Sequence, residues 1–181
     1  MMKLCTSNKC KAAEVARILA MPVEPVKVVL DEIQAIDPVV VSRAKAAQAF
    51  RELGVPVIVD DTALCLDGLN GFPGALIAWV LDSGGLELIH RMLPPGAEKG
   101  ARAVTVICYA DEGGVEAFVG EVAGEVIAAP RGENGFGFDA VFVPAGQGLT
   151  FAEMASEAKD HLSPRGQALR QLAAFLARKK G

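Results

Sequence analysis

Hydrophobic and polar positions along the chain alternate between short apolar runs and segments with the periodicity of a helix. From Lys9, apolar residues recur at intervals of three and four, which predicts an amphipathic helix that ends at Met21 and Pro22. The same periodicity predicts helices at 40–53, 76–93 and 163–179. Short apolar runs predict strands at 2–5, 26–30, 57–59, 103–110, 115–127 and 141–143. Because strands and helices interleave, the sequence predicts an α/β fold.

Two β-rich segments in the middle of the chain, 103–110 and 115–127, are joined by the turn sequence Asp-Glu-Gly-Gly, which predicts a hairpin. Gly120 and Gly124 lie inside the second arm and predict bulges or a bend there. No repeat, low-complexity stretch or Ser/Pro-rich linker interrupts the sequence. We therefore expect one domain that spans residues 1–181.

Composition narrows the class of protein. The 181 residues are 51% hydrophobic, which supports a full core and excludes a disordered chain. Lys and Arg number 18 against 22 Asp and Glu, so the basic surplus typical of proteins that bind nucleic-acid polymers is missing. No apolar run approaches the roughly 18 residues of a membrane span, and the four cysteines form no CxxC pair. We therefore expect a soluble, cytoplasmic protein without nucleic-acid or membrane partners.

A polar hexapeptide, Thr6 to Lys11, follows the first predicted strand and opens the first predicted helix. Asn8 suits the N-cap, whereas Lys9 and Lys11 oppose the positive end of the helix dipole at a cost of about 0.3–1 kcal/mol. A bound anion would reverse the sign of that cost, and the hydroxyls of Thr6 and Ser7 could donate to it. Read alone, the segment indicates a phosphate cradle or, equally, solvated lysines on a capped helix.

Three acidic residues are candidates for metal chemistry. Asp60 and Asp61 follow an apolar run and precede Thr62, and Glu32 follows another predicted strand. Adjacent carboxylates at the end of a buried strand are costly unless a metal, a donor or a proton compensates them. Mg²⁺ takes few carboxylates directly and completes its shell with water and phosphate. The alternatives are a turn in which one aspartate caps a helix, and a solvated loop acid.

A loop with aromatic and glycine residues could contact a flat ligand. It consists of Phe136, Gly137, Phe138 and Asp139. Glycine permits close approach of the backbone, and an aromatic ring offers a stacking face. Packing of the phenylalanines in the core is the alternative.

The start of the last predicted helix gathers an amine, a hydroxyl and a guanidinium from Lys159, Ser163 and Arg165. Ser163 suits the N-cap and Pro164 the first helical position, while Arg165 opposes the helix dipole. A ligand site or ordinary surface charge would both explain this group.

Taken in order, these motifs resemble those of the Ham1/RdgB family of inosine triphosphate pyrophosphatases. The resemblance extends over nearly the whole chain. The segments that carry it are Thr6-x-Asn8-x-x-Lys11, Glu32-Ile33-Gln34, Asp60-Asp61-Thr62-Ala63-Leu64, Leu69-Asn70-Gly71-Phe72-Pro73-Gly74, Pro130-Arg131-Gly132, Phe136-Gly137-Phe138-Asp139, Thr150-Phe151-Ala152-Glu153-Met154 and Lys159 to Arg165.

The resemblance implies an elongated mixed β-sheet flanked by helices, and a homodimer. It implies hydrolysis of dITP, ITP and XTP to the monophosphate and pyrophosphate, with Mg²⁺, or Mn²⁺ in its place, as the cofactor. Such an enzyme would remove non-standard purines from the nucleotide pool.

The resemblance also implies roles for the motif residues. Thr6, Ser7, Asn8, Lys9 and Lys11 would hold the triphosphate. Glu32 and Asp61 would hold the metal, and Asp61 would be the base that activates water for attack on the α-phosphorus. Thr62 would touch substrate, Phe138 would stack on the purine and Lys159 would contact the nucleotide. The remaining base-site residues would be Phe136, Gly137, Asp139, Ser163 and Arg165.

Three positions depart from the family pattern. Pro164 replaces the histidine of Ser-His-Arg, Ala140 replaces the proline after Asp139, and Asp160 replaces the asparagine after Lys159. Proline cannot donate a side-chain hydrogen bond to the 6-keto edge of a base. We therefore expect weaker discrimination for inosine and xanthine bases, with hydrolysis retained.

Two alternatives remain open at this point. One is the same reaction on another pool, such as standard or modified pyrimidine triphosphates, as in the related Maf-like group. The other is a nucleotide-binding sensor that has lost turnover. The intact Glu32, Asp61 and Lys11 argue against the sensor, because a non-catalytic descendant has no need to keep the acids.

Overall fold

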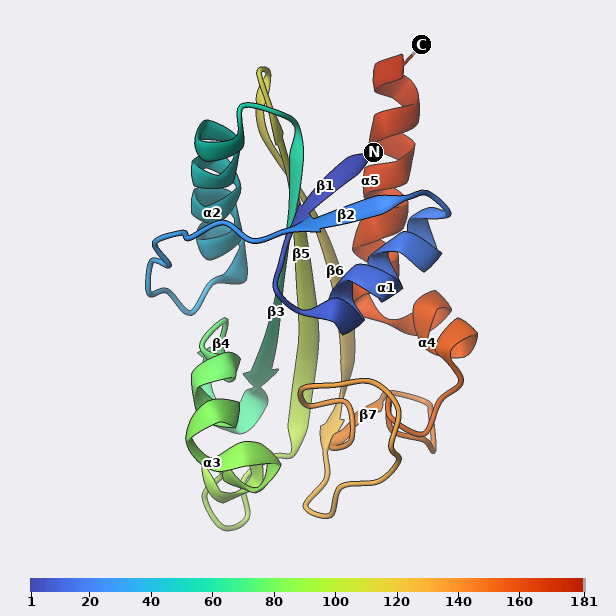
Figure 1. The fold of residues 1–181 in the computed structure, drawn as a ribbon. Helices are drawn as coiled ribbons and strands as arrows, with labels where there is room; N and C mark the ends of the chain where they lie inside the picture. The colour runs from blue at the N-terminus through green and yellow to red at the C-terminus, as the bar shows by residue number, and fades with distance from the viewer. Residues whose placement is uncertain (181) are drawn as a thin grey trace.

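The structure is a computed structural model that describes residues 1–180, and it contains one sheet flanked by helices (Figure 1). The strands are β1 (Met2–Cys5), β2 (Val23–Val26), β3 (Val57–Leu66), β4 (Pro73–Gly74), β5 (Gly100–Asp111), β6 (Gly114–Val126) and β7 (Phe142–Pro144). The helices are α1 (Lys9–Leu19), α2 (Pro38–Leu53), α3 (Ile77–Arg91), α4 (Ser156–Leu162) and α5 (Pro164–Lys180), with a 3₁₀ turn at Asp67–Leu69.

The sheet is mixed and elongated. Its order is β2-β1-β3-β5-β6-β7, with β4 paired to the far end of β3. β1 runs parallel to β2 and β3, whereas β3, β5, β6 and β7 pair antiparallel. The long strands β3, β5 and β6 run most of the length of the molecule, and α3 lies at the end away from the chain termini (Figure 1).

Helices cover both faces of the sheet, and side chains of β3 alternate between them. Val57 and Val59 pack with Ala46 and Ala49 of α2. Ile58 packs on the opposite face, in a cluster with residues of α1 and α5. Because side chains of a strand alternate in direction, this register assigns Asp60 to the face of α1 and α5, and Asp61 to the face of α2.

The structure corrects the predicted bounds of two strands. The second strand covers Val23–Val26 rather than 26–30, because the chain leaves the sheet after the Val26 carbonyl accepts a hydrogen bond from the Thr6 amide. The third strand continues to Leu66, so Asp60, Asp61 and Thr62 lie within it rather than after it. The ionic residues interrupt the apolar pattern by which a strand is predicted from sequence. The strand nevertheless continues, because its pairing with β5 extends to Leu66. Helix α4 was absent from the predicted elements.

The predicted bulges at Gly120 and Gly124 are wrong, because both residues pair in an uninterrupted β5–β6 register. Close approach of backbone explains the glycines instead. A Cβ at Gly120 would collide with the Pro164 carbonyl at the start of α5, and one at Gly124 would collide with the Val143 carbonyl of β7. No helix in the described part of the chain is both long and apolar enough to cross a membrane.

Candidate functional site

A capped helix N-terminus opens the site. The Asn8 side chain accepts hydrogen bonds from the backbone N–H groups of Cys10 and Lys11 at 2.9 and 3.2 Å, which confirms the predicted N-cap. Thr6 Oγ1 accepts one from the Asn8 amide at 3.1 Å. The turn between β1 and α1 is therefore fixed by its own polar side chains, and it directs the positive end of α1 toward the cavity described next.

This cavity, which we call the acid–lysine cavity, has a volume of about 360 Å³. Its chemically active lining comes from the Thr6–Lys11 segment, the loop after β2, helix α2 and strand β3. The lining polar residues are Thr6, Ser7, Asn8, Lys11, Lys27, Glu32, Lys45, Asp60 and Asp61. Lys9 is exposed and does not line the cavity. The cavity thus brings together most of the predicted phosphate and metal residues.

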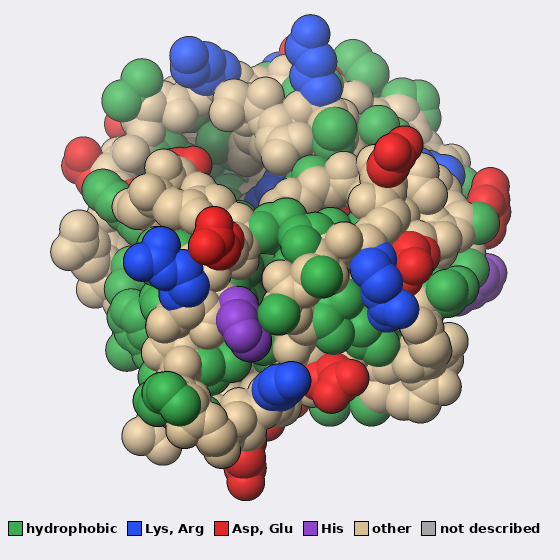
Figure 2. Space-filling view, turned by 90° about the horizontal axis from the view of Figure 1, so that it is seen from below, with side chains coloured by type: hydrophobic (Ala, Val, Ile, Leu, Met, Phe, Trp, Pro, Cys, Tyr) green, Lys and Arg blue, Asp and Glu red, His purple; other side chains and the backbone are tan. Residues whose placement is uncertain are grey.

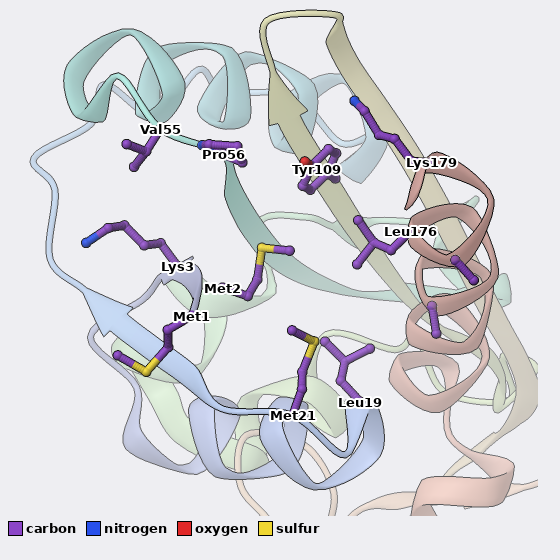
Figure 3. Close-up of a pocket in the computed structure, with 12 residues that line it drawn as sticks. Met1, Met2, Lys3, Leu19, Met21, Val55, Pro56, Tyr109, Leu176 and Lys179 are labelled. Carbon is purple, nitrogen blue, oxygen red and sulfur yellow. The ribbon is translucent and has the colours of Figure 1, made fainter. Parts of the chain in front are cut away.

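A larger groove of about 840 Å³ lies at the end of the molecule near both chain termini (Figure 3). Its lining is mostly apolar, including Met2, Leu19, Met21 and Leu176. It shares no residue with the acid–lysine cavity. Volume therefore does not locate the chemistry, whereas the convergence of charged groups does.

Asp60 is committed to an internal ion-pair network. Its carboxylate accepts hydrogen bonds from Arg165 Nε and Nη2 at 2.7 and 3.1 Å, and Lys11 Nζ lies 3.0 Å from Oδ1. Burial opposes ionisation of the carboxyl, but Arg165 and Lys11 outweigh it and hold the pKa of Asp60 well below its usual range. Asp60 therefore positions two cations and has no free face for catalysis.

Asp61 faces the cavity from the other side of β3. Lys45 Nζ donates to Asp61 Oδ1 at 2.6 Å, and Ser42 Oγ donates to Oδ2 at 2.8 Å. The same ammonium lies 3.4 Å from Glu32 Oε1. Burial of Lys45 is outweighed by Asp61 and Glu32, so its pKa is raised. Glu32 and Asp61, the two acids predicted to hold metal, therefore lie on either side of the same ammonium group.

The sequence analysis missed Lys45 and Ser42. Their three-residue spacing places both on one side of α2, but nothing in the sequence shows that this side faces Asp61. Among the described residues, no three His, Cys, Asp or Glu side chains cluster as a protein-only metal cage. Two carboxylates and a hydroxyl beside an open cavity fit Mg²⁺, which binds through few protein ligands together with phosphate and water.

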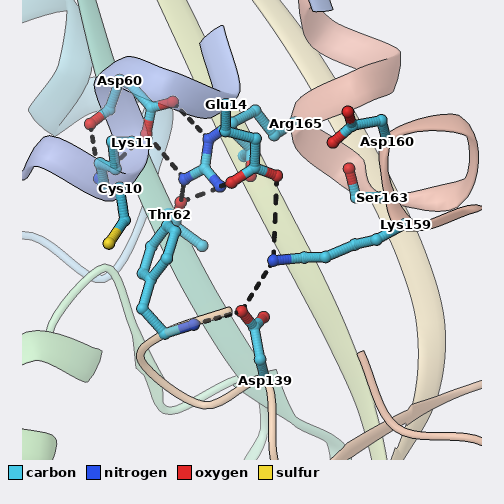
Figure 4. Close-up of polar contacts among 12 residues, drawn as sticks. Cys10, Lys11, Glu14, Asp60, Thr62, Asp139, Lys159, Asp160, Ser163 and Arg165 are labelled. Carbon is cyan, nitrogen blue, oxygen red and sulfur yellow. Dashed lines mark hydrogen bonds and ion pairs between the residues drawn. The ribbon is translucent and has the colours of Figure 1, made fainter. Parts of the chain in front are cut away.

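A second group of charges surrounds Arg165 (Figure 4). Its Nη1 donates to Glu14 Oε2 at 3.0 Å and its Nη2 to Thr62 Oγ1 at 3.0 Å. Lys159 Nζ donates to Asp139 Oδ2 at 2.7 Å and lies 3.9 Å from Glu14 Oε1. Glu14, on α1, was also missed, although a carboxylate on the buried side of an amphipathic helix is the signal that could have found it.

The two phenylalanines of the aromatic loop have different environments. Phe138 is only 7% exposed and belongs to the apolar core. Phe136 is half-buried, and both Lys159 Nζ and the Arg165 guanidinium carbon lie 5.2 Å from its ring centroid. Its amide donates to Asp139 Oδ2 at 2.7 Å. Of the two rings, that of Phe136 lies nearer these cations, while Phe138 lines a small cavity with Lys159 and Arg165. The stacking of Phe138 on a base stays a prediction.

Ser163 and Pro164 start α5 as the sequence predicts. Ser163 Oγ accepts a hydrogen bond from the Gly166 amide at 3.1 Å, and Pro164 is the first helical residue. Both line a small cavity of about 20 Å³ together with Thr62, Lys159 and Arg165. Residue 164 therefore borders the charged group around Arg165.

Comparison with known proteins decides the family. The model of the Ham1 family matches residues 2–175. The chain belongs to the Ham1 family. It is 42% identical over 184 residues to the inosine triphosphate pyrophosphatase of Candida glabrata, with 94% of each chain covered. It is 40% identical over 179 residues to the dITP/XTP pyrophosphatase of Pyrobaculum aerophilum, with 96% of this chain and 95% of that protein covered.

Solved Ham1 structures share the fold. The Staphylococcus aureus Ham1 protein superimposes with a TM-score of 0.85 at 26% identity, with 98% of both chains covered. A Coxiella burnetii HAM1 protein gives 0.84 at 28% identity, with 98% of this chain and 100% of that chain covered. The elongated mixed α/β fold implied by the sequence resemblance is thereby confirmed.

One departure of this Ham1 chain has a clear structural role. Asp160 accepts hydrogen bonds from Arg17 Nε and Nη2 at 2.5 and 2.9 Å, a two-point contact that joins α4 to α1. An asparagine would offer one acceptor oxygen instead of two, so the pair is specific to the carboxylate. Nothing in the structure explains Ala140.

Proposed function

We propose that the chain hydrolyses non-standard purine nucleoside triphosphates, ITP, dITP and XTP, to the monophosphate and pyrophosphate. The observation that carries the proposal is the position of Asp61, which faces a polar cavity between a capped helix N-terminus and Lys45. The relatives named inosine triphosphate pyrophosphatase and dITP/XTP pyrophosphatase, which are 42% and 40% identical to this chain over most of its length, support the proposal.

The triphosphate would lie against the Thr6–Lys11 segment. The positive end of the α1 dipole and the ammonium groups of Lys11 and Lys45 provide positive charge there. Glu32 and Asp61 would hold Mg²⁺, or Mn²⁺ in its place. When bound, this ion supplies charge neutralisation at the phosphate oxygens. Catalysis of phosphoryl transfer depends mainly on such positioning and charge stabilisation.

Asp61 would accept the proton of the attacking water. The water oxygen bonds to the α-phosphorus, and the bond between that phosphorus and the oxygen of the leaving pyrophosphate breaks. Ser42 donates to the second Asp61 oxygen at 2.8 Å and fixes the carboxylate plane. Asp60 pairs with both Lys11 and Arg165, so it would fix the phosphate end of the site relative to the base end.

The base would stack on Phe136 beside Lys159. This ammonium donates to Asp139 and retains further N–H groups, and an ammonium has no acceptor. A 6-keto purine presents an acceptor oxygen to these donors, whereas adenine presents an amino group. The geometry therefore favours keto purines. Pro164 borders this region without a side-chain donor, which supports relaxed base selectivity as the second candidate.

Identifying which phosphorus the water attacks tests the proposal. With ITP in water labelled with heavy oxygen, we expect the label in the monophosphate and none in pyrophosphate, as measured by mass spectrometry. Label in inorganic phosphate or in pyrophosphate would contradict attack on the α-phosphorus.

We also propose a cytoplasmic homodimer. Trp79 of α3 is 63% exposed and Phe72 is 39% exposed, and both line a shallow apolar pocket with Leu76 and Leu88. Seen from the end of the molecule that carries α3, hydrophobic side chains lie between charged ones (Figure 2). Sedimentation equilibrium should give twice the chain mass at micromolar concentration, and a monomer would contradict the proposal.

A further inference from the structure

Three lysines line the acid–lysine cavity, and two of them are paired with acids of β3. Lys11 Nζ lies 3.0 Å from Asp60 Oδ1, and Lys45 Nζ donates to Asp61 Oδ1 at 2.6 Å. The third, Lys27, lines the same cavity but forms no ion pair with an acid in the described part of the chain. Its ammonium is therefore available to a bound ligand.

The register of the sheet brings Lys27 to the floor of the cavity. Val26, Cys5 and Val59 lie side by side across β2, β1 and β3. The residues that follow them along the chain all line the cavity, and these are Lys27, Thr6 and Asp60. The Thr6 amide donates to the Val26 carbonyl at 3.1 Å. This hydrogen bond fixes the point at which the chain leaves β2, directly before Lys27.

The loop that begins at Lys27 is also anchored further along. The Asp31 amide donates to Gln48 Oε1 of α2 at 3.0 Å. Figure 1 shows the chain after β2 running toward α2. Glu32 follows directly and lines the cavity as well. One loop, held at both ends, therefore presents an acid and an unpaired lysine to the same space.

The position of Lys27 across the sheet indicates which phosphate it would meet. Neighbouring strands lie about 4.8 Å apart, so β2 lies about 10 Å from β3 across β1. In the proposed function the α-phosphorus lies at Asp61 of β3, and the triphosphate extends along the Thr6–Lys11 segment that follows β1. The γ-phosphate is the group farthest from the α-phosphorus, and Lys27 follows the strand farthest from Asp61 on this side of the sheet.

The charges of the cavity favour the same assignment. Lys11 and Lys45 already offset the charges of two aspartates, and a metal ion offsets only part of the charge of a triphosphate. The terminal phosphate carries the highest charge of the three phosphates. An ammonium group binds phosphate as a point charge, so an ammonium without an acid partner has its largest effect at that phosphate.

We propose that Lys27 binds the γ-phosphate and so selects nucleoside triphosphates over diphosphates. The inference rests on the proposed function, because it takes the α-phosphorus to lie at Asp61. The Lys27 ammonium donates to oxygens of the terminal phosphate, a group that IDP lacks. Lys27 is thus a binding residue that holds the pyrophosphate portion of the substrate and takes no part in proton transfer.

Binding of ITP and of IDP tests this role. Each nucleotide is titrated with Mg²⁺ in a calorimeter into the Asp61→Asn protein, with and without Lys27→Gln. A hydrogen bond to a charged group corresponds to about 10- to 150-fold in affinity, so we expect ITP to bind more weakly by that factor in Lys27→Gln. The affinity for IDP should stay close to that of the parent protein.

Two further variants separate the charge of Lys27 from a structural effect. Lys27→Arg keeps the positive charge and should restore most of the affinity for ITP. Lys99→Gln removes an exposed lysine that does not line the cavity, and it should bind both nucleotides like the parent protein. Unchanged ITP affinity in Lys27→Gln, or an equal loss for ITP and IDP, would overturn the γ-phosphate role.

Pyrophosphate release by the wild type is a separate readout of the proposed function. Absence of release, together with a loss of ITP affinity confined to Lys27→Gln, would contradict only the proposed function. Release of pyrophosphate, together with equal losses for ITP and IDP, would contradict only the role of Lys27.

Discussion

Asp60 and Arg165 lie 105 positions apart in sequence and form a two-point contact in the interior, with nitrogen–oxygen distances of 2.7 and 3.1 Å. Their side chains are 0% and 5% exposed. Glu14 accepts from the remaining side of the guanidinium, so β3, α1 and α5 meet at one cation. The neighbouring Asp61 is instead held by Lys45 of α2. One pair of adjacent aspartates therefore serves two separate purposes.

Replacement of Asp60 by Asn should destabilise the fold. Breaking a buried ion pair typically costs about 3–5 kcal/mol, and we expect a loss of that size in the free energy of unfolding at pH 7. The pKa of Asp60 is lowered by folding, so its contribution is present above its unfolded pKa near 3.9 and is lost as the pH falls through the folded value. Urea denaturation at several pH values should show the difference narrowing in strong acid.

The exposed Asp82→Asn variant on α3 is the matched control and should unfold like the wild type. If Asp60→Asn were equally stable at pH 7, the network around Arg165 would not support the fold.

Replacement of Asp61 by Asn should remove turnover while nucleotide binding persists. A positioned general base contributes about 10²- to 10⁴-fold, so kcat should fall by at least that factor. Steady-state pyrophosphate release and calorimetric binding of ITP separate the two effects. Asp31→Asn, an exposed acid beside Glu32, is the control and should retain activity. Full activity in Asp61→Asn would exclude it as the base.

Lys45→Gln should lower kcat. The Lys45 ammonium offsets the negative charges of Asp61 and Glu32 in the free protein. In the proposed complex it adds positive charge beside the phosphates. Loss of a preorganised charge at the reacting group typically costs about 10²- to 10³-fold in rate. Arg51→Gln, an exposed cation on the same helix, should have no effect in the same assay. Equal rates in both variants would remove Lys45 from the site.

Phe136→Ala and Phe138→Ala separate base stacking from core packing. We expect Phe136→Ala to raise KM for ITP while the melting temperature stays close to that of the wild type. Phe138→Ala should lose about 3–5 kcal/mol of stability, because it empties a core position. Thermal unfolding and initial rates measure both quantities. The reverse pattern would return the stacking role to Phe138.

Pro164→His should sharpen selectivity for ITP over ATP, because only the 6-keto purine presents an acceptor oxygen to the new donor. A side-chain donor gained at the base edge corresponds to about 1–3 kcal/mol, or about 5- to 150-fold. Competition between the two substrates measures the ratio of their kcat/KM values. An unchanged ratio would show that Pro164 does not set base selectivity.

Local chemistry made part of the site predictable from sequence. The N-cap at Asn8 and the Ser163–Pro164 start of α5 depend on neighbouring residues, and the structure confirms both. Partners distant in sequence were not predictable. Lys45 gains its significance only when α2 packs against β3, and Glu14 only when α5 brings Arg165 to it.

The same limit explains the errors in the fold. Asp60 and Asp61 interrupt the apolar pattern of β3, so the predicted strand ended too early, although cations from other elements stabilise both acids. Gly120 was predicted to form a bulge because the local sequence does not show that the Pro164 carbonyl, 44 positions further along the chain, packs against it. The core position of Phe138 and the half-buried position of Phe136 likewise depend on tertiary packing that the local sequence does not show.

Pyrophosphate release in the presence of Mg²⁺ is the most direct test of the account. The panel comprises ITP, dITP, XTP, GTP, ATP, dTTP and UTP, each with the wild type and with Asp61→Asn. We expect release from ITP, dITP and XTP to exceed that from ATP, dTTP and UTP, and to disappear in the variant. Preference for pyrimidines, or binding of ITP without any release by the wild type, would contradict a purine triphosphate pyrophosphatase.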